Sequence, residues 1–176
     1  NPLTEEGIAL GKKLFFDKRL SKDNTQSCAS CHNPRNSFTD NLRFSLGVDG
    51  VSGTRNSMPL FNLAWNFNDK FAWDGKELSL ERQALEPVRN PIEMHSSWSN
   101  VALRLQQDQE YPLMFLNAFG TERIDSTLVT KAIAQFERTL ISGNAKFDQY
   151  LLGNTSLNQQ ELNGFTIFMS EDKGDC

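Results

Sequence analysis

The sequence predicts a mostly α-helical protein whose long loops wrap a bound ligand. Apolar residues recur at helical spacing over most of the 176 residues, and the alternation that is typical of strands is nearly absent. Residues 21–53 are instead rich in Ser, Asn, Asp and Gly and show little periodicity. Such a stretch is long for a loop of a compact domain, so we expect a bound cofactor to organise it.

The first element is a predicted helix over residues 5–16. Thr4 suits its N-cap, because a hydroxyl there can accept a hydrogen bond from a free backbone N–H. Glu5 and Glu6 suit the positive end of the helix dipole. Its apolar face is formed by Ile8, Leu10, Leu14 and Phe15. Later helices are predicted, between Pro, Gly and Asn signals, over residues 79–85, 98–107, 112–119, 126–141 and 157–169.

Composition and charge exclude several kinds of protein. A net charge of −4 at pH 7 without a basic stripe argues against a nucleic-acid partner. No apolar run approaches the roughly 20 residues that cross a bilayer, so we expect no membrane span. The first residues lack the basic and apolar character of a signal peptide, which predicts a mature or trimmed start. Three cysteines cannot all pair with one another, so a disulfide framework explains them poorly.

The strongest motif is Cys28-x-x-Cys31-His32, the C-x-x-C-H pattern of haem attachment. Two thiols at this spacing can add to the two vinyl groups of one porphyrin, and the adjacent histidine is then placed to ligate the iron. We therefore expect one c-type haem, held covalently by Cys28 and Cys31, with His32 as an axial ligand. A zinc site is a weaker alternative, because only His95 and Cys176 remain as further ligands. A thioredoxin-like dithiol would need a βαβ surround that the sequence does not predict.

A weak internal repeat bears on the organisation of the chain. Residues 11–15 and 164–168 share a Gly-x-x-aliphatic-Phe pattern, each on a predicted helix that runs towards a cysteine, Cys28 or Cys176. This pattern suggests a second module that begins near residue 157 and whose own cysteine motif is cut off. A chance likeness between two amphipathic helices is an equally open interpretation.

Further motifs lie in several short segments. They are Leu14-Phe15-Phe16-Asp17, Ser27-Cys28 to Asn33-Pro34, Phe38-Thr39-Asp40-Asn41, Thr54-Arg55-Asn56-Ser57, Phe71-Ala72-Trp73-Asp74-Gly75-Lys76 and Pro91-Ile92-Glu93-Met94. In this order they resemble the N-terminal part of the bacterial dihaem cytochrome c peroxidases, a family that also contains the MauG-like dihaem oxidases. The resemblance runs from about residue 10 to Cys176, nearly the whole chain.

The resemblance implies an all-α, cytochrome c-like haem domain over residues 1–156, with long loops that wrap the haem. Residues 157–176 would be the opening helix of a truncated second cytochrome c-like domain. Cys176 would be the first thioether cysteine of a second haem. The full-length protein would then carry two haem c groups, one of them in this chain.

For activity, the resemblance implies that hydrogen peroxide is reduced to water at the first haem. Electrons would come from a small cytochrome c or cupredoxin through the second haem. Thioether attachment of haem takes place outside the cytoplasm in bacteria, so a periplasmic location is expected. A homodimer is left open.

Four site residues follow from the resemblance. Glu93 matches the distal acid that moves a proton between the peroxide oxygens, and Gln83 matches a distal glutamine that hydrogen-bonds peroxide or water. Trp73 matches the tryptophan that relays electrons between the haems, and Asn56 matches an asparagine that binds calcium near the domain interface. Without the resemblance, these would be a solvated loop acid, a surface helix residue, a core aromatic and a turn residue.

One segment departs from the family. Many members carry a histidine after Ser-x-Gly that blocks the iron until the other haem is reduced, whereas this chain has Val48 there. Valine cannot ligate iron, so we predict an open or water-filled distal site that needs no reductive activation. The remaining candidate ligands are His95, which is more typical of a surface position, and Met58 and Met94, which are more typical of a core.

Two other functions remain open. One is a non-enzymatic electron-transfer cytochrome c with a closed sixth position and no substrate. The other is a MauG-like oxidase that uses peroxide to oxidise a tryptophan or tyrosine of a partner protein. The residue that separates oxidase from peroxidase lies beyond Cys176. The aromatic residues of 61–65 and 136–150 are interpreted as core and haem-pocket packing without a catalytic role.

Overall fold

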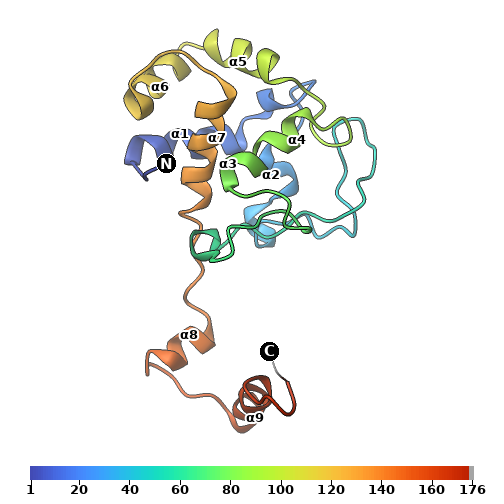
Figure 1. The fold of residues 1–176 in the computed structure, drawn as a ribbon, viewed down its shortest axis with the longest axis vertical. Helices are drawn as coiled ribbons and strands as arrows, with labels where there is room; N and C mark the ends of the chain where they lie inside the picture. The colour runs from blue at the N-terminus through green and yellow to red at the C-terminus, as the bar shows by residue number, and fades with distance from the viewer. Residues whose placement is uncertain (175–176) are drawn as a thin grey trace. The chain divides into compact units, whose positions relative to one another are not determined.

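The computed structural model describes residues 1–174. It falls into two compact units, Asn1–Ile141 and a smaller one that begins at Ser142. Helices provide nearly all the regular structure of the described residues, beside three isolated β-bridges (Figure 1). This confirms the predicted all-α class. No helix among residues 1–174 has the length and apolar content that crossing a membrane requires.

The first unit contains most of the helices. They are α1 (Glu5–Phe16), α2 (Cys28–Cys31), α3 (Leu80–Gln83), α4 (Leu85–Arg89), α5 (Trp98–Gln106), α6 (Tyr111–Phe119) and α7 (Ser126–Glu137). Short 3-10 helices lie between them: η1 (Lys18–Leu20), η2 (Pro34–Asn36) and η3 (Leu63–Trp65). The second unit contains α8 (Lys146–Leu151) and α9 (Gln159–Phe168).

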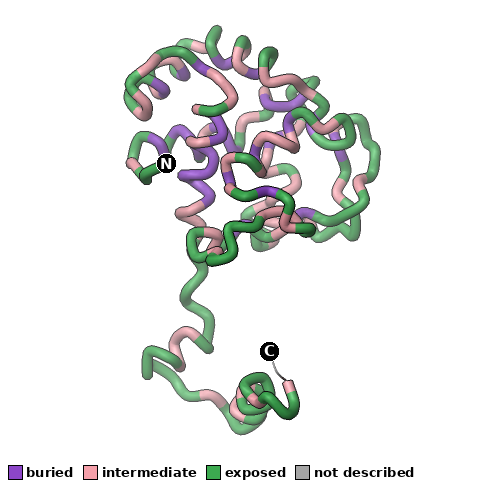
Figure 2. Tube along the Cα trace, in the orientation of Figure 1, coloured by how far each residue is buried: buried purple, intermediate pink, exposed green. Residues whose placement is uncertain are grey.

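The pair α1 and α7 forms the centre of the first unit. Thr4 caps α1 as predicted, accepting a hydrogen bond from the Gly7 N–H at 3.0 Å. Gly11 lies so close to α7 that a Cβ there would be 1.9 Å from the carbonyl oxygen of Ala132. Buried segments concentrate in these two helices and in the elements around them (Figure 2). The largest fully buried side chains include Leu10, Leu14, Phe15, Tyr111, Phe115 and Ile133.

The helix predicted over residues 79–85 is in fact two short helices, α3 and α4. Pro87 accounts for the break, because it has no N–H to donate to the carbonyl oxygen of Gln83 and its ring crowds that carbonyl. Helical structure continues beyond the predicted end to Arg89, so α4 carries the chain towards Glu93.

The helix predicted over residues 126–141 is shorter than expected, because α7 ends at Glu137. The Thr139 hydroxyl donates to the carbonyl oxygen of Phe136 at 2.7 Å, which satisfies one of the free carbonyls at the helix end. The early end leaves Glu137 in the last turn, where its side chain is 4% exposed.

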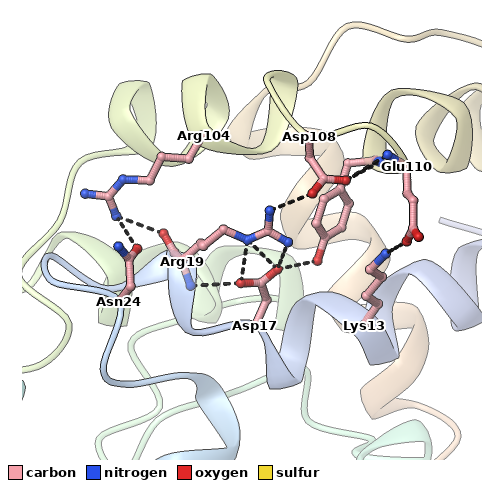
Figure 3. Close-up of polar contacts among 8 residues, drawn as sticks. Lys13, Asp17, Arg19, Asn24, Arg104, Asp108 and Glu110 are labelled. Atoms are coloured by element: carbon pink, nitrogen blue, oxygen red, sulfur yellow. Dashed lines mark hydrogen bonds and ion pairs between the residues drawn. The ribbon is translucent and has the colours of Figure 1, made fainter.

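A polar network anchors the chain that leads to Cys28 (Figure 3). The Asp17 carboxylate accepts hydrogen bonds from the Arg19 guanidinium at 2.7 and 3.0 Å and from the Tyr111 hydroxyl at 2.6 Å. Arg19 also donates to Asp108 at 2.8 Å. Burial raises the pKa of Asp17, but these hydrogen bonds outweigh it and hold that pKa below its ordinary value. The network ties η1 to the start of α6.

Arg104 of α5 holds the start of the long loop. Its guanidinium donates to the carbonyl oxygens of Arg19 at 3.0 Å, Ser21 at 2.6 Å and Lys22 at 3.0 Å, and to the Asn24 side chain at 3.2 Å. Buried or half-buried carbonyl groups need such partners wherever no helix or sheet supplies them. The Arg104 side chain therefore supplies the hydrogen bonds that a helix or sheet would otherwise give to the start of this loop.

The second unit is a pair of helices joined by aromatic contacts. The Phe165 ring of α9 lies 5.1 Å from that of Phe147 and 6.5 Å from that of Tyr150, both in α8, measured between centroids. α9 corresponds to the helix predicted over residues 157–169, whereas α8 was not predicted. Cys176 lies outside the described residues. The boundary between the two predicted domains stays a prediction.

Candidate functional site

The first unit encloses a cavity of about 460 Å³. Binding sites for organic ligands and cofactors commonly measure about 300–1,000 Å³, so a cofactor-sized group is a suitable occupant. Every predicted site residue within the described part of the chain lines this cavity: Cys28, Cys31, His32, Asn56, Trp73, Gln83 and Glu93. The structure thus brings together segments that lie far apart in the sequence.

The single turn of α2 places both cysteines on the cavity side. The Ser30 hydroxyl accepts a hydrogen bond from the Ser27 N–H at 3.0 Å and so caps this short helix. Residues three apart share one face of a helix, which is why Cys28 and Cys31 both face the cavity. The His32 N–H donates to the carbonyl oxygen of Cys28 at 2.9 Å, so the histidine follows directly on the same turn.

His32 is oriented for metal ligation. Its Nδ1 lies 3.0 Å from the carbonyl oxygen of Phe38 and 2.9 Å from that of Met58. Both partners only accept, so Nδ1 carries the proton and Nε2 keeps its lone pair. Burial lowers the pKa of His32, against the two hydrogen bonds that favour the charged form. The ring is therefore a neutral imidazole with Nε2 free for a metal.

The two thiols are protonated rather than reactive. Burial raises the pKa of Cys28 to about 12, with a further contribution from Glu137. Burial likewise raises the pKa of Cys31 to about 11, with Asp40 and Glu93 adding to it. Redox-active dithiols have lowered thiol pKa values. In addition, the described residues contain no cluster of three or more His, Cys, Asp or Glu side chains placed to hold a metal ion. The zinc and dithiol alternatives therefore lose support.

The lining of the cavity fits a haem group. Apolar side chains, among them Leu20, Val88 and Ile133, form part of its wall. The wall also contains two buried polar atoms, Ser45 Oγ and Glu137 Oε2, that have no hydrogen-bond partner in the described part of the chain. Buried polar atoms are rarely left unpaired in a complete site. An amphiphilic macrocycle attached through the two cysteines suits a wall of this mixed character.

Glu93 enters the cavity from the segment between α4 and α5. The Asn90 side chain holds it, with Nδ2 donating to Glu93 Oε1 at 2.6 Å. Burial raises the pKa of Glu93, and the hydrogen bond from Asn90 opposes that increase without cancelling it. A carboxyl with a raised pKa exchanges protons more readily near neutral pH than an ordinary one.

Gln83 lies at the end of α3, which Ser79 caps by accepting from the Arg82 N–H at 3.2 Å. Its side-chain amide has no hydrogen-bond partner within residues 1–174, although it lines the cavity. An amide of this kind offers both a donor and an acceptor to a small polar ligand. Gln83 and Glu93 therefore bring complementary chemistry to one space.

Trp73 and Asn56 meet at the rim of the cavity. The indole Nε1 of Trp73 donates to the backbone carbonyl oxygen of Asn56 at 3.0 Å. Trp73 is 55% exposed, so its interpretation as a core aromatic is wrong. The side chain of Asn56 is also exposed, and its role in binding calcium stays a prediction.

Of the alternative iron ligands, Met58 and Met94 line the cavity, whereas His95 does not. His95 Nδ1 is 2.5 Å from Asp49 Oδ2. Met58 holds His32 through its backbone carbonyl, on the side of the ring opposite to Nε2. Met94 is 5% exposed and belongs to the core. The open distal site stays a prediction.

Sequence reasoning missed Glu137. It lines the cavity from the end of α7, and burial raises its pKa to about 8. The charge of its neighbour Arg138 lowers that pKa only in part, because the guanidinium binds Glu81 at 2.8 Å and the Glu81 charge acts in the opposite direction. The sequence offers only a weak signal: Gln135 and Glu137 are the polar residues of the otherwise apolar stretch 132–137.

Relatives are known for almost the whole chain. The family model described as di-haem cytochrome c peroxidase matches residues 5–156. Methylamine utilization protein MauG of Methylorubrum extorquens is 45% identical over 96% of this chain and 48% of its own length. Cytochrome c551 peroxidase of Nitrosomonas europaea is 38% identical over 99% of this chain and 52% of its own length. The crystal structure of a MauG-like protein associated with microbial copper homeostasis superposes with a TM-score of 0.89 at 34% identity, over 97% of this chain and 51% of that one. The chain thus spans about half the length of these relatives.

Proposed function

Because the chain belongs to the di-haem cytochrome c peroxidase family, we propose that its first unit holds one haem c and reduces hydrogen peroxide to water there. The observation that carries this proposal is the shared cavity, where the haem-attachment residues meet Gln83 and Glu93. A simple electron carrier has no need of an unpaired amide and an acid in the same space. The neutral imidazole of His32, held by two backbone carbonyl groups, would ligate the haem iron.

Haem c, when bound, supplies the redox-active iron at which peroxide is reduced. Cys28 and Cys31 hold the macrocycle, so that it cannot dissociate. Gln83 orients the peroxide through its side-chain amide. Glu93 accepts the proton of one peroxide oxygen and donates it to the other as the O–O bond breaks. In total, one peroxide, two protons and two electrons give two waters, and the electrons come from a small cytochrome c or cupredoxin.

The remaining assignments concern the second half of the protein. Trp73, half-exposed at the rim of the cavity, relays electrons from a second haem. Residues 157–176 open the second haem domain, and Cys176 provides the first of its thioether bonds. Asn56 contributes a neutral oxygen to a calcium site whose other ligands lie beyond this chain. Since haem is attached outside the cytoplasm, the protein works in the periplasm.

A MauG-like oxidation of a partner protein is the second candidate function. Identity to the MauG of Methylorubrum extorquens, at 45%, exceeds the 38% to the Nitrosomonas peroxidase. Both functions use the same peroxide-binding cavity and differ in the source of electrons. Turnover with reduced cytochrome c identifies the peroxidase, whereas peroxide-dependent oxidation of an aromatic residue in a co-purifying protein identifies the oxidase.

The test of the proposed function is Glu93→Gln in the haem-loaded, full-length protein. We expect the rate of reaction with hydrogen peroxide, followed through the haem absorbance, to fall by about 10² to 10⁴, the usual contribution of a positioned proton-transfer group. The haem content should not change. Glu161→Gln, which removes an exposed ion pair with Lys146 in the second unit, is the control. An unchanged rate in Glu93→Gln would refute the role of Glu93.

A further inference from the structure

The loop around Gly47 lies directly against the segment that carries Glu93. A Cβ on Gly47 would be 2.1 Å from the carbonyl oxygen of Ile92 and 2.9 Å from that of Glu93, so only glycine fits there. The Val48 N–H donates to the carbonyl oxygen of Glu93 at 2.7 Å. The backbone of this loop therefore sets the position of the Glu93 backbone.

Asp49 joins this loop to both neighbouring segments. Its carboxylate is 2.5 Å from His95 Nδ1 and accepts from Lys22 Nζ at 2.9 Å. The backbone N–H of Lys22 in turn donates to the carbonyl oxygen of Met94 at 2.9 Å. Residues 92–95 therefore receive backbone hydrogen bonds from both the Gly47 loop and Lys22. The Asp49 carboxylate links this loop to Lys22 and to His95.

The side chain of His95 is directed towards Asp49. The backbone φ of His95, +48°, lies in the left-handed region, a conformation that histidine adopts more often than most residues and that seven other non-glycine residues of 1–174 share. The side chain that this backbone presents does not enter the cavity but binds Asp49. The hydrogen bonds from His95 and Lys22 lower the pKa of Asp49, so its carboxylate stays charged in the pH range in which Glu93 titrates.

Stability of the fold does not account for the network. The side chains of Asp49, His95 and Lys22 are 37%, 43% and 50% exposed, and exposed ion pairs contribute little to folding. The loop also keeps its own shape through backbone hydrogen bonds, such as that from the Gly47 N–H to the Val51 carbonyl oxygen at 2.9 Å. The network instead fixes the position of the Gly47 loop relative to the segment that carries Glu93.

We propose that Asp49 is a positioning residue for proton transfer: by holding His95 and Lys22 together, it fixes the direction in which Glu93 points into the cavity. This inference rests on the proposed role of Glu93. It adds a residue that contacts neither haem nor peroxide and acts through the backbone of its neighbours.

The experiment uses the haem-loaded, full-length protein with Asp49→Ala, Asp49→Asn and Asp49→Glu. We expect Asp49→Ala and Asp49→Asn to slow the reaction with peroxide at least about fivefold, towards the roughly hundredfold cost of a misplacement of about 1 Å. Asp49→Glu should recover part of the rate. The amides of Val48 and Lys22, which bond to residues 93 and 94, should exchange hydrogen faster in Asp49→Ala. Glu110→Gln, which removes the exposed ion pair with Lys13, is the matched control.

A double variant separates this inference from the proposed function. If Asp49 acts through Glu93, Asp49→Ala causes no further loss of rate in the Glu93→Gln background. Two outcomes would overturn the positioning role of Asp49 while Glu93→Gln remains slow. One is a further loss of rate when Asp49→Ala is added to Glu93→Gln. The other is an unchanged rate together with unchanged amide exchange in Asp49→Ala alone. If Glu93→Gln itself is as fast as the unaltered protein, the proposed role of Glu93 fails instead. Amide exchange at Val48 then still reports whether Asp49 holds the loop.

Discussion

Two acids that line the cavity, Glu93 and Glu137, differ in exposure and in hydrogen bonding: Glu137 is 4% exposed, whereas Glu93 is an exposed residue. Burial raises the pKa of both. Glu93 keeps a donor in Asn90, whereas Oε2 of Glu137 has no hydrogen-bond partner within residues 1–174. Glu93 is accordingly placed to gain and lose a proton, whereas Glu137 is mostly protonated at neutral pH. At the scale of residues, the surroundings of each carboxyl set its chemistry.

Replacing Asn90 should shift the pH dependence of the peroxide reaction. Asn90→Ala removes the hydrogen bond that lowers the pKa of Glu93, so that pKa rises further. Because Glu93 must be deprotonated to accept a proton, the acidic limb of the pH profile should move to higher pH. Glu86→Gln removes a charge that raises the same pKa and should move the limb to lower pH. Stopped-flow rates between about pH 4 and 8 check both directions, and shifts of the same sign would contradict the assignment.

Glu137→Gln should change how stability depends on pH. A raised pKa in the folded state means that folding binds a proton, so this contribution is present at pH values below the ordinary pKa of Glu and is lost as pH rises through about 8. The variant lacks this loss and should gain stability relative to the unaltered protein between pH 5 and 8, by an amount on the order of 3 kcal/mol. Denaturant unfolding of the variant and of the unaltered protein at pH 5 and pH 8 measures this difference in stability. Parallel pH dependence of the two proteins would show that Glu137 is not buried as described.

At the scale of elements, local signals were sufficient for α1 but not for the shorter helices. The cap at Thr4 and the apolar periodicity of α1 are both local in the sequence, and both were confirmed. α2 is a single turn, too short to show periodicity, and α8 lacks a recognisable capping residue at Ala145. The path of the long loop depends on Arg104, which no local pattern relates to it.

The two glycines of the internal repeat provide a matched pair of substitutions. A Cβ on Gly11 meets the backbone of Ala132, whereas a Cβ on Gly164 meets nothing within 4 Å. Gly11→Ala should therefore force α1 and α7 apart and cost at least about 1–3 kcal/mol of stability. Gly164→Ala should be neutral or stabilise α9 by up to about 1 kcal/mol, because alanine favours helix. Thermal unfolding compares them, and equal effects would contradict the close contact of α1 with α7.

At the scale of the whole molecule, the cavity is a product of distant segments. The attachment motif could be recognised from spacing alone, since its chemistry is local. Gln83, Glu93, Trp73 and Asn56 could be named only through resemblance, because nothing in their own neighbourhoods distinguishes them. Glu137 and Asp49 could not be predicted in either way: their importance depends on which groups the fold leaves unpaired or brings together.

Loss of haem attachment should loosen the long loop over residues 21–58 but not helices α1 and α7. Buried apolar residues of the first unit skip from Leu20 to Leu60, so the intervening loop has no apolar core of its own. A Cys28→Ser and Cys31→Ser double variant should exchange its amide hydrogens faster over residues 21–58 than the haem-loaded protein. Amides of α1 and α7 should stay protected. Equal protection of the loop in both proteins would show that it folds without haem.

The protonated state of the two thiols has a consequence for maturation. Disulfide formation proceeds through the thiolate, and with thiol pKa values of about 12 and 11 no more than about one in ten thousand of either thiol is ionised at pH 7. Oxidation of the folded chain in an oxidising compartment is therefore slow compared with that of ordinary cysteines. Because residues 21–58 should loosen without attached haem, this protection applies to those unloaded chains in which both thiols are still buried, and in them the competition between haem delivery and thiol oxidation favours delivery.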